Sequence, residues 1–121
     1  MTEELEKRIE EIASDNGWKV RLYEQDGQEN IEFEGYTPIG QDLIVNIWSD
    51  RFESLSDVED SLWHYAEDFD PDEEAYKWLG PDGHGMNGAP YHIADVLEDM
   101  VYAEQKIYAL KIYALADAFH E

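Results

Sequence analysis

A run of carboxylates lies between Arg51 and Lys77, and no lysine or arginine interrupts it. Acidic side chains one helical turn apart approximate part of the charge density of DNA, which carries one negative charge per roughly 1.7 Å of its axis. We interpret them as a surface that imitates phosphates and binds a basic protein; the alternative is a solvated acidic surface without a partner. The residues concerned are Asp57, Asp60, Glu67, Asp68, Asp70, Asp72, Glu73 and Glu74.

Calcium chemistry fits part of the same run poorly. Asp68, Asp70 and Asp72 have the spacing of the first three ligands of a calcium-binding loop. Glu73 and Leu79, however, stand where that loop needs a glycine and a glutamate. We therefore predict no dedicated calcium site.

The histidines offer no familiar metal or catalytic pattern. His84 and His92 flank a glycine-rich segment, but their spacing matches no zinc motif and the chain has no cysteine. The sequence contains no phosphate-binding loop, dinucleotide-binding fingerprint or nucleophile elbow. We expect a protein that is not an enzyme and that uses neither a metal nor another cofactor.

The overall charge restricts the partners. Thirty acidic residues against eight basic ones give a formal net charge of −22. This charge argues against direct binding to nucleic acid or to an anionic membrane, because a protein needs cations to meet their phosphates. Basic proteins are the expected partners. With 121 residues, of which 43% are hydrophobic, the chain is predicted to fold as a single domain over residues 1–121.

The N-terminal segment is charged and lacks the apolar run of a signal peptide. No apolar window approaches the roughly 20 residues that a membrane span requires. Without cysteines, nothing in the sequence asks for an oxidising compartment. We expect a soluble, cytoplasmic protein.

The first half of the chain has the pattern of one helix followed by three strands, in which apolar and polar residues alternate. A first helix is predicted between a Thr2 cap and a stop at Asn16 and Gly17. Three strands follow, over residues 18–23, 29–35 and 43–48, and the first two form a hairpin around Asp26 and Gly27. The third strand is apolar on both faces, so we expect it to be the central one.

The second half of the chain reads as helical. Ser56 and Glu59 predict a capping box for a second helix, and a short helix follows from Pro71. A long, largely apolar helix is expected from about Ala89 to Phe119, with Asp99 in its narrow polar stripe. This helix packs across the sheet or partly against a second copy of the protein; the candidate dimer residues are Tyr108, Ile112, Leu115 and Phe119.

The predicted fold class is α+β: a three-stranded antiparallel sheet with the N-terminal helix, the two shorter helices and the long C-terminal helix packed on one face. Trp63 falls beside the acidic face of the second helix. It is interpreted equally well as an anchor for a partner, because tryptophan is enriched at interface hot spots, or as part of the core.

Two segments carry a resemblance to a known group of proteins. FEGYTPIGQD at Phe33–Asp42 and FDPDEE at Phe69–Glu74 resemble segments of small acidic proteins of bacteriophages and mobile elements of gut bacteria. The resemblance implies a mobile-element setting, in which small acidic proteins often counter host defences. A looser likeness, in composition alone, is to DNA-mimic antirestriction and anti-defence inhibitors.

These observations lead to two functional hypotheses. In the first, the protein is a DNA-mimic inhibitor that binds a basic DNA-binding protein, such as a restriction or RNA-guided defence nuclease. In the second, it is a non-enzymatic interaction or assembly module, dimeric through its last helix, and its acidity only keeps it soluble. Binding that weakens with salt favours the first, because salt screens charge and strengthens apolar contacts.

Overall fold

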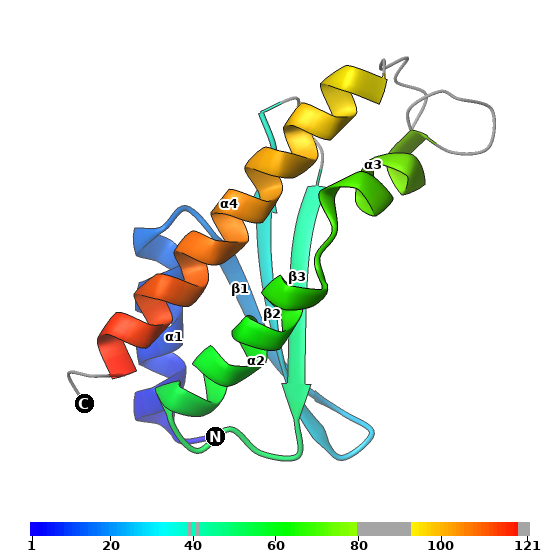
Figure 1. Ribbon diagram of the computed structural model, residues 1–121. Helices are drawn as coiled ribbons and strands as arrows, with labels where there is room; N and C mark the ends of the chain where they lie inside the picture. Colours follow the sequence, from blue (N-terminus) through cyan, green and yellow to red (C-terminus); the bar gives the residue numbers. More distant parts are fainter. Residues whose placement is uncertain (39, 41, 80–92, 119–121) are drawn as a thin grey trace.

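The computed structural model describes residues 1–38, 40, 42–79 and 93–118, and the side chains of residues 1–38, 40, 42–75 and 94–110. The elements follow one another as α1 (Glu3–Asp15), β1 (Lys19–Gln25), β2 (Gln28–Tyr36), β3 (Asp42–Ser49), α2 (Leu55–Asp68), α3 (Pro71–Leu79) and α4 (Ile93–Ala118). The strands form one antiparallel sheet, and α4 crosses in front of it with α2 beside β3 (Figure 1). The predicted α+β class is confirmed.

The order of the strands differs from the prediction. The sheet runs β1-β2-β3, so β2 is central and β3 lies at an edge. The prediction took the apolar outer residues of β3 as a sign of burial on both faces. Instead, Ile44 is 47% exposed and Trp48 is 58% exposed, because the helices in the described part of the chain cover the opposite face, where Val45 and Ile47 are buried.

Local rules explain the hairpin and the first helix. Asp26 and Gly27 have φ values of 54° and 77°, the conformation that a two-residue hairpin loop requires. The hydroxyl of Thr2 accepts a hydrogen bond from the N–H of Leu5 at 3.1 Å and thus caps α1, which ends at Asn16. Both predictions are confirmed.

The start of α2 corrects another prediction. The N-cap is Ser54 and not Ser56: the Ser54 hydroxyl accepts from the N–H of Asp57 at 3.4 Å. The Asp57 carboxylate in turn accepts from the N–H of Glu53 at 2.8 Å. A serine followed three residues later by an acid occurs twice in this segment. The earlier pair forms the cap, because the helix then begins at Leu55, whose side chain is fully buried.

The core lies between the sheet and the helices. Leu5 and Ile9 of α1, Leu62 of α2 and Ile107 of α4 meet the buried face of β2 around Phe33. A second cluster joins α3 to the first half of α4; it consists of Ala75, Val96 and Met100, with Phe69 packed against both clusters. Asp99, predicted in the polar stripe of the long helix, is only 3% exposed, because α3 packs against this part of α4.

Glu29 of β2 is a buried carboxylate that connects the N-terminus and the segment before α2. It accepts hydrogen bonds from the terminal ammonium of Met1 and from the N–H of Phe52, the latter at 2.7 Å. Burial acts to raise the pKa of Glu29, but these two donors and the positive charges of the N-terminus and Arg51 outweigh burial, and the pKa lies below its ordinary value. Glu29 therefore ties the start of the chain and the segment before α2 to the sheet.

Candidate protein-binding site

The acids predicted to bind a partner lie on α2 and at the start of α3, and we call them the α2–α3 carboxylates. Asp60, Glu67 and Asp68 of α2 are exposed. Asp57 is half-buried, and its carboxylate accepts a hydrogen bond from the N–H of Glu53. These four residues lie within about one third of the circumference of α2, since successive helical residues are rotated by roughly 100°. The full set is Asp57, Asp60, Glu67, Asp68, Asp70, Asp72, Glu73 and Glu74.

The carboxylates at the start of α3 stabilise this helix in addition to carrying charge. The carboxylate of Asp70 accepts a hydrogen bond from the N–H of Asp72 at 3.0 Å, at the position that caps a helix beginning with Pro71. Asp72 and Glu73 are exposed in the first turn, where negative charge is favoured by the helix dipole. Part of this acidity is therefore explained by helix stability alone.

α2 and α3 follow each other along the same side of α4 (Figure 1). The exposed acids from Glu67 to Glu73 therefore lie at the junction of these two helices. His64 of α2 lies beside these acids, with its Nδ1 3.9 Å from Oε2 of Glu67.

The aromatic candidates are placed differently. Trp63 is 45% exposed and is not part of the buried core. Tyr108, one of the four candidate dimer residues, is 37% exposed on α4, and Val101 and Tyr102 of the same helix are also exposed. The side chains of the other candidates lie outside the described residues, as does all of one of them; they are Ile112, Leu115 and Phe119.

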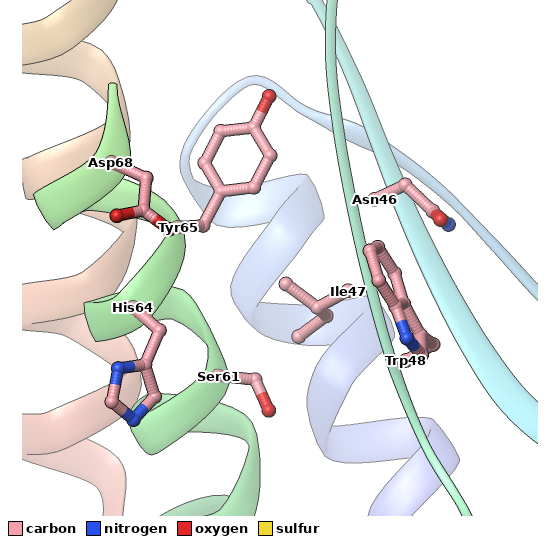
Figure 2. Close-up of a pocket in the computed structure, with 7 residues that line it drawn as sticks. All are labelled: Asn46, Ile47, Trp48, Ser61, His64, Tyr65 and Asp68. Atoms are coloured by element: carbon pink, nitrogen blue, oxygen red, sulfur yellow. The ribbon is translucent and has the colours of Figure 1, made fainter. Parts of the chain in front are cut away.

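A groove between α2 and the edge strand β3 was not foreseen from the sequence. It encloses about 310 Å³ and is lined by Asn46, Ile47, Trp48, Ser61, His64, Tyr65 and Asp68. The ring of Tyr65 lies between the helix and the strand (Figure 2), and its hydroxyl donates to the carbonyl of Ile44 at 3.1 Å. Burial raises the pKa of this hydroxyl, and the charge of Glu74 raises it further, so Tyr65 stays a donor.

The apolar outer residues of the third predicted strand are the one feature of the sequence that indicated an unusual surface next to this groove. The width of the groove depends on how far α2 lies from β3, which no local pattern encodes. Among the described residues, no group of three or more histidine, aspartate or glutamate side chains is arranged to hold a metal ion. No helix in the described part of the chain is long and apolar enough to cross a membrane.

The fold and the site define a small, strongly acidic α+β protein with a helix-covered sheet, one exposed sheet face and a groove at the sheet edge. Comparison of the chain with known protein families, with curated proteins and with solved structures finds no match.

Proposed function

We propose that the protein is an inhibitor of the DNA-mimic type. It binds a basic DNA-binding protein, such as a restriction or RNA-guided defence nuclease, through the α2–α3 carboxylates. The observation that carries this proposal is the exposure of Asp60, Glu67, Asp68, Asp72 and Glu73 on α2 and at the start of α3, in a chain with a net charge of −22. A basic cleft that evolved for phosphates is attracted to such exposed carboxylates.

The charge density of α2 supports mimicry of a single DNA strand. With 14 residues, α2 is about 21 Å long. One DNA strand carries roughly six phosphates over that distance, and the duplex carries about twelve. Four of the α2–α3 carboxylates lie on α2, namely Asp57, Asp60, Glu67 and Asp68. The helix thus approaches the charge of one strand but not of two, and the acids of α3 prolong the row.

The test compares two variants of identical net charge. The first reverses three of the α2–α3 carboxylates: Asp60→Lys, Glu67→Lys and Asp72→Lys. The matched control reverses three exposed acids elsewhere, on α1 and β1: Glu10→Lys, Asp15→Lys and Glu24→Lys. Each reversal changes the charge by two, so both variants change −22 to −16.

The protein is tagged and used to capture partners from lysates of bacteria that carry restriction and RNA-guided systems, at low and at high salt. We expect one basic DNA-binding protein, released by salt and by duplex DNA. In a cleavage assay with that partner, the α2–α3 variant loses inhibition while the control variant keeps it. Equal inhibition by both folded variants would contradict the proposal, because the position of the acids would then not matter.

The second candidate is an interaction or assembly module that dimerises through α4. It is favoured by Val101, Tyr102 and Tyr108, which are 44%, 42% and 37% exposed on that helix. Two copies of net charge −22 repel each other, so such a dimer would tighten as salt screens the charge. Sedimentation at low and high salt separates the two candidates, since binding to a basic partner responds to salt in the opposite direction.

A further inference from the structure

β3 offers a free strand edge. Tyr65 of α2 donates to the carbonyl of Ile44, so the backbone groups of Ile44 point toward α2 and away from β2. In an antiparallel ladder the backbone groups of every second residue point the same way, which places the N–H and C=O groups of Asn46 and Trp48 on this edge too. Within the described residues no strand lies opposite them. Such an edge is a template for pairing with another chain.

The space beside this edge is the groove already described. β3 forms one wall, and Ser61, His64 and Asp68 of α2 form the other (Figure 2). The side chain of Asn46 points away from α2 in Figure 2, so it is the backbone of Asn46 that borders the groove. A strand edge that faces a helix across a groove is the arrangement in which several peptide-binding domains add a strand to their sheet.

We propose that this groove binds a short, extended, basic segment of a partner protein, of about five residues, as a fourth strand next to β3. Its backbone pairs with Asn46 and Trp48, and its side chains alternate between two environments. Those that point toward α2 are lysine or arginine and meet Asp68. Those that point toward the open face are apolar and pack on Trp48, whose side chain is 58% exposed.

The charge of the protein selects this occupant over a second copy of the chain. Pairing of two β3 edges would bring together two molecules of net charge −22. The groove is flanked by the α2 acids Asp68 and Glu67, both exposed, and a cationic segment relieves this charge. The hydrogen bond from Tyr65 to Ile44 occupies one end of the edge, which limits the added strand to the stretch around Asn46 and Trp48.

This inference differs from DNA mimicry because it requires the backbone of β3, although Asp68 belongs to both proposed surfaces. The probe is a fluorescein-labelled peptide of about six residues in which lysine and valine alternate. Its control has proline in place of valine: the charge is the same, but proline lacks the N–H group that a ladder needs. We expect the lysine–valine peptide to bind at least about tenfold more tightly than the control, because hydrogen bonds of the backbone are lost.

A variant of the protein completes the test. Asn46→Pro removes the edge N–H group and crowds the groove edge, yet leaves the β2–β3 ladder intact, because edge strands tolerate proline where the N–H faces outward. We expect binding of the lysine–valine peptide to weaken about tenfold in Asn46→Pro and to stay within about twofold in Asn46→Ala. Circular dichroism and thermal unfolding check that both variants are folded.

Amide NMR of the wild-type protein adds a readout that does not depend on the variants. We expect the peptide to shift the amides of Asn46 and Trp48 and to slow their hydrogen exchange. Equal affinity for both peptides, or an unchanged affinity in folded Asn46→Pro, would overturn the proposal, since charge alone would then explain binding. Asn46→Pro and the proline peptide change no carboxylate of α2 or α3, so they test strand pairing without altering the surface proposed for DNA mimicry.

Discussion

Replacing Gly35 by alanine tests the packing of the sheet against α4. A methyl group at Gly35 would lie 3.0 Å from Nζ of Lys106 and 3.1 and 3.2 Å from two ring carbons of Trp18. The lysine side chain is long and can move aside. Trp18 cannot, because it is 4% exposed and its ring packs edge-on against Phe33 with 6.3 Å between ring centres. The indole, or the strand beneath it, must shift.

The magnitude follows from two opposing effects. Overpacking of this kind costs about 1–3 kcal/mol. Alanine recovers roughly 0.5–1 kcal/mol over glycine in a strand, because it restricts the unfolded chain. We therefore expect Gly35→Ala to lower the free energy of unfolding by about 1 kcal/mol, within a range of about 0–2.5 kcal/mol, and the central value corresponds to a fall in Tm of roughly 4 °C for a domain of this size.

The assay is urea unfolding followed by circular dichroism, carried out as a double-mutant cycle. Trp18→Phe removes the outer ring carbons that the new methyl group would meet. In this background Gly35→Ala should cost at least about 1 kcal/mol less than in the wild type, because the two residues are in direct contact. The same cost in both backgrounds, or a gain of stability in the wild type, would refute this account of the packing.

Two further predictions concern the cap of α2 and the buried carboxylate. Ser54→Ala should lower the free energy of unfolding by about 1 kcal/mol and Ser56→Ala by less than about 0.5 kcal/mol, as measured by urea unfolding, because only Ser54 caps the helix. Since the pKa of Glu29 is lower in the folded state than its ordinary 4.5, the stability that it contributes is present above pH 4.5 and is lost as the pH falls through the folded value. In Glu29→Gln, Tm should therefore fall less steeply than in the wild type as the pH is lowered below 4.5. An unchanged slope would show that other groups cause the loss of stability at acid pH.

Much of the fold could be predicted because its signals are local. The alternation in β1 and β2, the positive-φ pair Asp26 and Gly27, and the Thr2 cap each act within a few residues. The order of the strands is not local. An apolar outer residue such as Trp48 looks the same in a sequence whether a second layer covers it or, as here, it remains exposed. The prediction of the N-cap of α2 was wrong for a related reason. Ser54 and Ser56 look equivalent in the sequence, and the burial of Leu55 in the fold decides that Ser54 is the cap.

The candidate site also has one part that local sequence signals predict and one part that they do not. Helical periodicity was enough to predict that Asp60 and Glu67 lie on the outer side of α2, and both are exposed. The groove beside α2 could not be predicted, since it depends on the distance between α2 and the edge of β3 and on the bridge from Tyr65 to Ile44. The sequence contains the residues of both surfaces, but only the fold places the groove next to the acids.

The two proposed surfaces both lie along α2, so one partner could bind to both of them. Such a partner would show distinct effects on the rates of association and dissociation. The outward carboxylates act at long range, so reversing Asp60 and Glu67 slows association and weakens its dependence on salt. Pairing with the β3 edge acts only at contact, so Asn46→Pro speeds dissociation and leaves association nearly unchanged. A single partner that shows both effects, each with its own variant, would use charge for encounter and the strand edge for residence.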